Sequence, residues 1–287
     1  MPSLKELNVK IASLKNTQKM TKTMKLVAAS KMRRAQEAKD NAHDYAERLV
    51  QVMAGLAAAG TTVEHPLLLA REGAKRALML AVCSDRGLCG GFNNNLCRQV
   101  ARWIADNEAK YGQVDVSTCG KRTQSYFRTR NSINTYYEGV TDKPTYEAAA
   151  RIADDCMAAF TSGDYDEIYI GYNRFRSALS QVPTLEQLLP IEKETAGEET
   201  QSGFNYLFEP PEKELLDHVL PNAVRFRVFN VLLENAAGEH AARMTAMDSA
   251  TNNAGDMIDS YTLLRNRERQ AIITRELIEI VTGAESL

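Results

Sequence analysis

The chain has 287 residues, of which 44% are hydrophobic and 25% are charged, and its formal net charge is −2. This is an ordinary globular composition, and the near-neutral charge argues against a general nucleic-acid-binding protein. There is no run of eighteen apolar residues, so we expect no membrane span, and Met1 to Leu4 does not start the apolar core of a signal peptide.

One uninterrupted helix is predicted at the start of the chain, from Ser3 to Leu56. Ser3 and Glu6 form a capping box, and neither Gly nor Pro occurs between Ser3 and Gly55. A 3.5-residue repeat held this long is typical of a coiled coil, and the helix would be about 80 Å long, so it requires a partner helix of similar length. Its seam has sixteen positions, twelve of them apolar: Leu4, Leu7, Ile11, Leu14, Gln18, Thr21, Lys25, Ala28, Met32, Ala35, Lys39, Ala42, Ala46, Leu49, Met53 and Leu56.

The seam is interrupted by polar residues at Gln18, Thr21 and Lys25, and the helix is strongly basic. Residues 1–40 carry ten Lys and Arg against three acids, a net charge of +7, whereas residues 190–217 carry eight acids against two Lys. The lysines occur all round the helix. They indicate either a solvated helix surface or a docking surface for an acidic protein.

A different pattern, of alternating strands and helices, begins near Lys75. Strands are expected at residues 78–83, 114–118, 133–137, 167–172 and 180–189, and helices at residues 95–108, near 120–122 and from Pro144 to Phe160. Pro183 should place the last strand at an edge of the sheet or end it. This order predicts an α/β, Rossmann-like domain with a largely parallel sheet.

Helical patterning returns near Glu212 and continues to about Ala284, after an acidic loop at residues 192–199 and an aromatic patch at residues 204–208. Pro221 is expected to kink or restart the early turns of this helix. Because one compact domain joins the far ends of the two helices, we expect them to be antiparallel. The second seam comprises Phe226, Asn230, Leu233, Ala237, His240, Met244, Met247, Thr251, Ala254, Ile258 and Tyr261.

The fold class is therefore a mix of α and β structure, in which a long antiparallel coiled coil carries an inserted Rossmann-like domain. Four parts are expected. They are an N-terminal coiled-coil helix at residues 1–58, the α/β domain at residues 75–190, an acidic loop and foot at residues 191–211, and a C-terminal coiled-coil helix at residues 212–287.

Constellations for catalysis or metal binding are scarce. None of the four His residues has Cys or carboxylate partners at metal-ligand spacing, so we expect no metal and no cofactor. The five Cys residues are odd in number and contain no C-x-x-C pair, which indicates reduced thiols in a cytosolic compartment.

The Gly-rich segment from Ser84 to Asn93, SDRGLCGGFN, lies between a predicted strand and a predicted helix. Such a turn could bind phosphate at the helix N-terminus. The segment matches neither G-x-G-x-x-G nor G-x-x-x-x-G-K-[ST], and no Lys follows its glycines. The other interpretation is a tight loop in which glycines let the backbone turn, with Asp85 and Arg86 placed for an ion pair.

Four segments resemble the gamma-subunit family of the rotary, proton-translocating ATP synthases, bacterial type. The resemblance extends over the whole chain, in the right order and at the right spacing. The segments are KMTKTMKLVAASK at residues 19–31, the loop at residues 84–93 with Asp85, Arg86, Gly87, Gly90 and Gly91, EHAARMTAM at residues 239–247, and ITRELIEIVTGA at residues 273–284.

The resemblance implies a central rotor shaft that couples proton flow through the c-ring to ATP synthesis or hydrolysis. The shaft would also regulate ATPase activity and proton flow. The partners would be the ring of alpha and beta subunits, the epsilon subunit and the c-ring, with no nucleic acid. The chemistry would belong to the beta subunits. The chain would be peripheral, on the cytoplasmic face of the bacterial inner membrane, and associated with the membrane only through the c-ring.

The same resemblance assigns roles to individual residues. Coupling contacts with beta subunits are expected at Lys22, Met24, Lys25, Arg269 and Gln270. A foot that faces the c-ring and epsilon is expected at Lys31, Arg33, Arg34, Tyr206 and Glu209. The far end of the shaft, residues 279–287 with residues 3–11, should be relatively apolar and turn in an apolar collar. The thiol-regulated insertion of some photosynthetic relatives is absent from the sequence.

Two other functions remain open from the sequence. One is a stand-alone α/β nucleotide-binding enzyme with a helical stalk, for which the Gly-rich segment would bind the nucleotide. The other is a passive coiled-coil scaffold that does not move.

Overall fold

The computed structural model describes residues 3–58, 65–71, 73–191 and 212–285. They form two compact units: a helical unit, Met1–Ala29 with Arg243–Leu287, and a sheet unit, Ser30–Ala242. In chain order the elements are α1 (Leu4–Ala58), η1 (Pro66–Leu68), β1 (Arg76–Val82), α2 (Phe92–Asn107), β2 (Gln113–Cys119), α3 (Lys121–Phe127), β3 (Ile133–Tyr137), α4 (Tyr146–Ser162), β4 (Glu167–Phe175), β5 (Gln181–Leu189) and α5 (Glu212–Glu285).

The sheet unit is built on five strands in the order β3-β2-β1-β4-β5. The first four are parallel, because each is reached through a crossover helix, while β5 returns directly and pairs antiparallel with β4. Pro183 opposes Asn173 and lies on the edge strand, as predicted. The predicted order of strands and helices is confirmed, and β3 has the predicted bounds.

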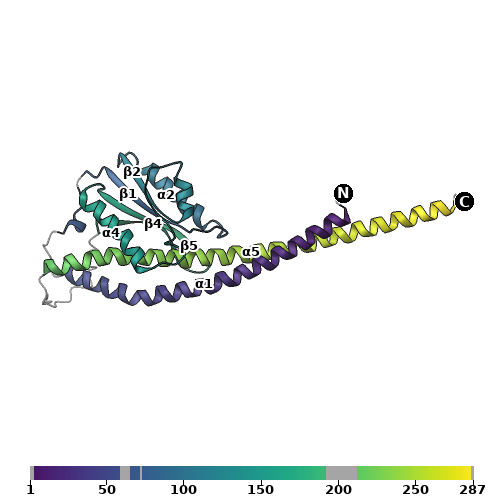
Figure 1. Cartoon of the computed structure of the whole chain (residues 1–287), viewed down its shortest axis with the longest axis horizontal. Coiled ribbons are helices and arrows are strands. Elements are labelled where there is room, and N and C mark those ends of the chain that lie inside the picture. The colour runs from purple at the N-terminus through teal and green to yellow at the C-terminus, as the bar shows by residue number, and fades with distance from the viewer. Residues whose placement is uncertain (1–2, 59–64, 72, 192–211, 286–287) are drawn as a thin grey trace. The chain divides into compact units, whose positions relative to one another are not determined.

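Helices cover both faces of this sheet (Figure 1). Alternate residues of β1 point to opposite sides, as a strand requires. Leu78, Leu80 and Val82 pack with residues of α4 and α5, whereas Met79 and Ala81 pack with residues of α2 and α3. The sheet is thus the middle layer, and α5 is part of the core of the sheet unit.

The helix α5 runs through Pro221 as one element, so the predicted restart of the helix is wrong. Proline removes one helical hydrogen bond and normally interrupts a helix. Here Leu220 and Val224, on either side of Pro221, are 1% and 2% exposed within the core that α5 shares with the sheet. Their burial stabilises the helical path across the proline.

In the helical unit, α1 and α5 pair antiparallel, as predicted. Lys10 lies over the ring of Tyr261, and Lys25 contacts Asp248, so that rising numbers on one helix meet falling numbers on the other. The predicted seam is confirmed over its described part: every seam position of α1 from Leu4 to Ala42 is buried or half-buried, and so is every seam position of α5.

Candidate functional site

The polar interruption of the seam is a layer in which both helices contribute matched polar groups. We call Gln18, Thr21, Lys25, Asp248 and Thr251 the polar layer. The hydroxyls of Thr21 and Thr251 are 2.7 Å apart, and the Lys25 ammonium lies 2.6 Å from the Asp248 carboxylate. The Gln18 amide donates to the carbonyl of Thr251 at 3.5 Å. The layer therefore satisfies its own polar groups where an apolar contact would be expected.

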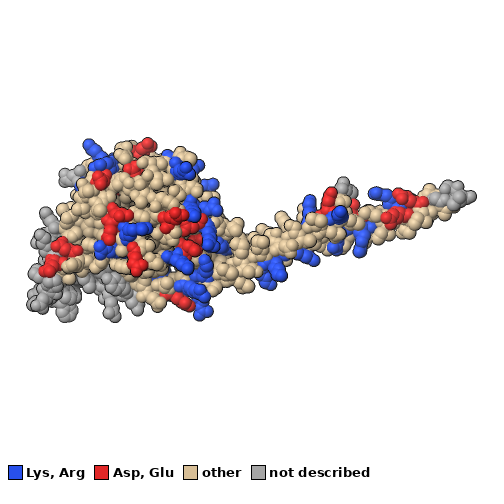
Figure 2. Space-filling model, in the orientation of Figure 1, with Lys and Arg blue, Asp and Glu red and all other residues tan. Residues whose placement is uncertain are grey.

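A shallow groove of about 480 Å³ opens beside the polar layer. Besides residues of the layer it is lined by Lys15, Lys19, Lys22 and Asn252. Four lysines and one aspartate give it a net positive charge. On the face drawn in Figure 2, Lys and Arg lie along this helical pair, and acidic side chains gather only toward the end that carries the chain termini. The groove can attract an acidic surface.

Three predicted coupling residues lie at this layer. Lys22 is exposed at the groove, whereas Met24 and Lys25 are half-buried. Lys25 is the one that is engaged, by Asp248. The structure therefore brings Lys22 and Lys25 to one groove and leaves Lys22 accessible.

The other two predicted coupling residues, Arg269 and Gln270, lie elsewhere on the helical unit. Both are exposed. They lie near the point where pairing with α1 ends, because Lys10 already contacts Tyr261 and α1 begins only six residues before Lys10, at Leu4. From there α5 continues beyond the start of α1 at Leu4. This single helix exposes a set of large apolar side chains: Ile273, Leu277, Ile278, Ile280 and Val281.

The predicted foot residues lie in the sheet unit or outside the described residues. Lys31 is 3.5 Å from Asp142, and Arg33 pairs with Glu37 of its own helix at 3.1 Å. Arg34 is exposed. Tyr206 and Glu209 lie outside the residues that the structure describes.

The Gly-rich segment forms a tight loop after β1, and Asp85 ties it to its neighbours. One carboxylate oxygen of Asp85 accepts from the backbone N–H of Lys121, at the start of α3, at 3.0 Å. The other accepts from the hydroxyl of Thr141 at 2.8 Å. Arg86 lies 4.0 Å from Asp142, which also meets Lys31. Of the two residues expected to form an ion pair, Arg86 therefore makes one within the chain, whereas Asp85 makes hydrogen bonds.

The glycines of this loop allow the backbone to turn tightly. Gly90 has φ of +58°, a conformation that glycine adopts without strain. A Cβ at Gly87 would press on the guanidinium of Arg122, and Gly91 is the N-cap of α2 without a side-chain cap. Leu88 also has a positive φ, +64°. This arrangement favours the tight-loop interpretation.

The inward-facing polar groups of this loop bond to one another. The side chain of Asn93 accepts from the backbone N–H of Ser84 at 3.1 Å and from its hydroxyl at 2.9 Å. Its amide group donates to Cys89 Sγ at 3.2 Å. Both Ser84 and Asn93 are buried. The inward-facing groups of the loop are therefore already satisfied.

The crevice at the carboxyl ends of β1 and β4, where open α/β sheets bind their ligands, is filled as well. The Asn235 amide of α5 donates to the carbonyl of Cys83 at 3.2 Å, and Asn173 donates to the carbonyl of Phe92 at 3.2 Å. A Cβ at Gly238 would lie 3.0 Å from the Phe92 ring. The packing of α5 against this edge thus takes the place of a ligand.

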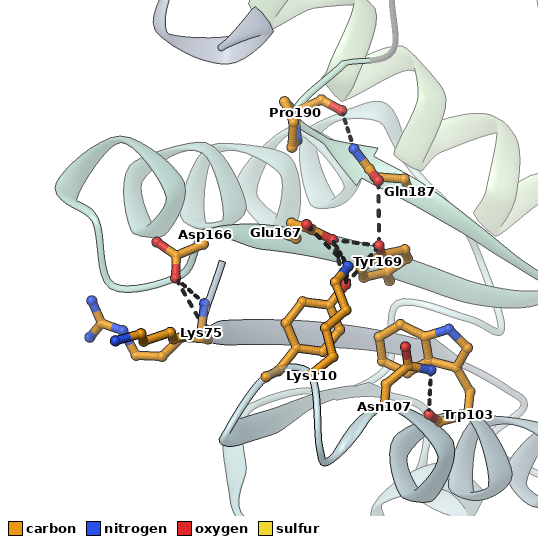
Figure 3. A network of polar contacts seen from close by, with 11 residues as sticks. Lys75, Trp103, Asn107, Lys110, Asp166, Glu167, Tyr169, Gln187 and Pro190 are labelled. Atoms are coloured by element: carbon orange, nitrogen blue, oxygen red, sulfur yellow. Dashed lines mark hydrogen bonds and ion pairs between the residues drawn. The ribbon is translucent and has the colours of Figure 1, made fainter. Parts of the chain in front are cut away.

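A polar cluster at the opposite edge of the sheet was not predicted from the sequence (Figure 3). The hydroxyls of Tyr111 and Tyr169 each donate to Glu167 at 2.5 Å, and Lys110 lies 3.4 Å from the same carboxylate. Burial raises the pKa of Glu167, but the hydrogen bonds from the two tyrosines and the charge and hydrogen bond of Lys110 together outweigh it and hold that pKa below its usual value. Trp103 packs on Tyr169, with ring centroids 4.6 Å apart.

Possible metal ligands and thiols were the remaining candidates among the described residues. Among them, no group of three or more His, Cys, Asp and Glu side chains could hold a metal ion. The five Cys residues are buried free thiols, and burial raises the pKa of Cys83 and Cys156. In the same part of the chain, none of the helices has both the length and the apolar character that crossing a bilayer requires.

Comparison with known proteins gives matches over the whole chain. A family model described as ATP synthase matches residues 3–287. The ATP synthase gamma chain of Geobacter metallireducens is 45% identical over 287 residues, which is 100% of this chain and 99% of that protein. The ATP synthase gamma chain of Trichlorobacter lovleyi is 43% identical over the same shares of the two chains.

Solved structures are similar too. A chain of the Tetrahymena thermophila mitochondrial ATP synthase central stalk and c-ring matches 80% of this chain and 99% of its own length, with a TM-score of 0.61 and 25% identity. A chain of the Euglena gracilis mitochondrial ATP synthase, in an OSCP/F1/c-ring structure, covers 99% of this chain and 94% of its own length, with a TM-score of 0.67 and 19% identity, and supports the fold alone. On these matches, the chain belongs to the ATP synthase gamma chain family.

Proposed function

We propose that this chain is the central rotor shaft of a rotary ATP synthase, which couples proton flow through a c-ring to ATP synthesis or hydrolysis at beta subunits. The observation that carries the proposal is the similarity to ATP synthase gamma chains, at 43% and 45% identity, over the full length of the chain. The antiparallel pair of helices, which contains a groove with four lysines, supplies a physical basis for it.

A shaft must transmit torque without unwinding. In α1 neither Gly nor Pro interrupts the helix before Gly55, so each turn keeps its full set of backbone hydrogen bonds. In the sheet unit, α5 is held to the strands by more than apolar packing. Glu186 of β5 pairs with Arg227 of α5 and with Arg174 of β4. Rotation of α5 would therefore carry the sheet with it.

In this proposal the chain has no catalytic site of its own. Asn93 bonds to Ser84 inside the loop, Asn235 of α5 donates to the carbonyl of Cys83 at the end of β1, and Gly238 packs against Phe92. We expect a nucleotide titration of the isolated chain to show no tight binding. Tight binding that is lost on changing the loop would instead support a nucleotide-binding enzyme.

The coupling contacts with beta subunits would be made by Lys22 and Lys25 at the groove, by Met24 between them in the sequence, and by Arg269 and Gln270 farther along α5. All of these side chains are exposed or half-buried. Such contacts must break at every step of rotation. Exposed ion pairs contribute only about 0–1 kcal/mol, so they can be exchanged without a large barrier.

The c-ring and epsilon would bind at the foot, through Lys31, Arg33 and Arg34 together with Tyr206 and Glu209. The shaft would then be peripheral, on the cytoplasmic face of the membrane. Co-purification of the tagged chain with alpha, beta and epsilon subunits and the c-ring tests these partners. If the chain is purified from membranes that make ATP and these subunits do not come with it, the proposal is contradicted.

Rotation itself is tested by a reversible cross-link. A disulfide between Gln270→Cys and a cysteine in the facing loop of a beta subunit should abolish coupled ATP turnover, and reduction should restore it. Gln270→Cys without the second cysteine is the matched control. If turnover is unaffected by a complete cross-link, the chain is a passive scaffold and the rotor proposal fails.

A further inference from the structure

The hydroxyl pair in the polar layer is the feature from which a new role follows. Three oxygen contacts are present: Thr21 to Thr251 at 2.7 Å, Thr21 to the carbonyl of Gln18 at 3.1 Å, and Thr251 to the carbonyl of Met247 at 2.7 Å. Two hydroxyl protons serve these three contacts. In either direction of donation, one bond crosses between the helices and the other returns to a backbone carbonyl. The pair is thus satisfied without water, and Thr21 is only 9% exposed.

The neighbouring seam contacts offer little resistance to rotation of one helix against the other. They include Ala28 and Ala254, whose side chains are single methyl groups, and the longer Met247, and apolar contact is non-directional. A hydrogen bond, by contrast, weakens steeply when its geometry is lost. A single polar residue in an otherwise apolar seam is known to fix register at some cost in stability.

The rest of the polar layer is shaped around this pair. A Cβ at Gly255 would lie 3.1 Å from the side-chain nitrogen of Gln18, so the glycine leaves room for the Gln18 amide to reach Thr251. Glycine inside a helix costs about 1 kcal/mol relative to alanine. The Lys25 and Asp248 side chains are 39% and 45% exposed, so water competes for their pairing. The hydroxyl pair, in which Thr21 is buried and Thr251 half-buried, is less exposed to water and is the more restrictive contact.

We infer that Thr21 and Thr251 are positioning residues that fix how far α1 is rotated about its own axis relative to α5. We call this rotation the rotational setting of the pair. The groove beside them is lined from both helices, by Lys15, Lys19 and Lys22 of α1 and by Asn252 of α5. Its shape therefore depends on that setting. Only the consequence for coupling rests on the proposed rotor function; the fixed setting is a property of the chain itself.

The setting can be measured as a distance between two spin labels on the full chain. Ser13→Cys on α1 and Asp259→Cys on α5 are exposed sites in the helical unit. The five native Cys residues are buried, so labelling is selective. With the native layer we expect a narrow distance distribution. In the Thr21→Val/Thr251→Val variant, which keeps the side-chain shape, we expect the width to at least double.

Three controls isolate the hydroxyl pair. Thr21→Ser/Thr251→Ser keeps both hydroxyls and should keep the narrow distribution. Thr23→Val removes an exposed hydroxyl that bonds only within α1, and should leave the width unchanged. Asp248→Asn removes the ion pair but not the hydroxyl pair, and should broaden the distribution much less than the double valine variant.

An unchanged distribution in the double valine variant overturns the inference. If that variant does not fold, as judged by its helical circular dichroism, Thr21→Val alone decides the matter, because Thr251 keeps its bond to Met247. If the valine variants broaden the distribution but the chain does not co-purify with alpha and beta subunits, the inference stands and the proposed function fails.

Discussion

The two units of this chain solve the burial of polar groups in opposite ways. In the sheet unit, buried polar side chains bond within the unit: Asn93 accepts from Ser84, and the Asn235 amide N–H donates to the carbonyl of Cys83. In the helical unit the buried core is one seam, and most of its polar residues face outward. The sheet unit therefore uses these polar groups internally, whereas the helical unit leaves most of its polar groups accessible.

This comparison predicts that single substitutions destabilise the sheet unit most. Gly120 has φ of +96°, and a Cβ there would lie 2.7 Å from the backbone oxygen of Cys83. We expect Gly120→Ala to lower the free energy of unfolding by about 3 kcal/mol or more, from strain and steric overlap together. Urea unfolding measures this.

The matched control is Gly139→Ala, at φ of +73° with no atom within 4 Å of the added Cβ. It should cost about 1 kcal/mol, from the backbone conformation alone. Equal losses in the two variants would mean that the close approach of β1 and the start of α3 is not important for stability.

In the helical unit the largest effects should fall on coupling rather than on stability. Arg269→Ala/Gln270→Ala removes polar groups proposed to bond a moving loop of beta, and should lower ATP synthesis about tenfold or more, a loss of about 1.4 kcal/mol in rate terms. Deletion of residues 279–287 should be tolerated better. ATP synthesis in membrane vesicles tests both variants, and equal losses would argue against this division of roles.

A positive charge added at Met24, next to the groove residue Lys25 in the sequence, should uncouple transport from synthesis. Met24→Lys places another cation beside Lys22 and Lys25, and is expected to lower ATP synthesis several-fold while leaving the melting temperature within a few degrees, because Met24 is only half-buried. Met24→Leu is the control for size. Normal ATP synthesis in membranes that carry Met24→Lys would rule out this role.

The cluster at Glu167 predicts a pH dependence of the sheet unit. Its pKa is lowered in the folded state, so its stabilisation is present above the ordinary glutamate pKa, about 4.3, and is lost as the pH falls through the lower folded value. Glu167→Gln should cost about 1–2 kcal/mol at pH 7. The difference in the free energy of unfolding between this variant and the native chain should shrink from pH 5 to pH 3. A difference that stays constant over this range would contradict the role given to Glu167.

The smallest effect is expected for the exposed ion pair of the polar layer. Lys25→Met should change the free energy of unfolding by less than about 1 kcal/mol, because both partners are well solvated. A loss of several kcal/mol on thermal or urea unfolding would mean that this pair, and not the threonine hydroxyls, dominates the layer.

Periodicity predicted the parts of this fold that repeat. The seam positions and the strand order follow from local spacing, and they are confirmed. Partners far apart in the sequence were not predictable in this way: Glu167 meets Tyr111 across 56 residues, and Thr21 meets Thr251 across 230. Pro221 was misjudged because burial of its neighbours, which sequence does not display, outweighs its helix-breaking tendency.

The unequal reach of the two helices has a mechanical consequence. The pairing of α1 with α5 ends near Arg269, and the last stretch of α5 is a single helix. Two rods bonded side by side resist bending more than the sum of the rods alone. The paired part of the shaft is therefore the stiff segment, and the single helix beyond it is the compliant one, where elastic deformation would concentrate under load.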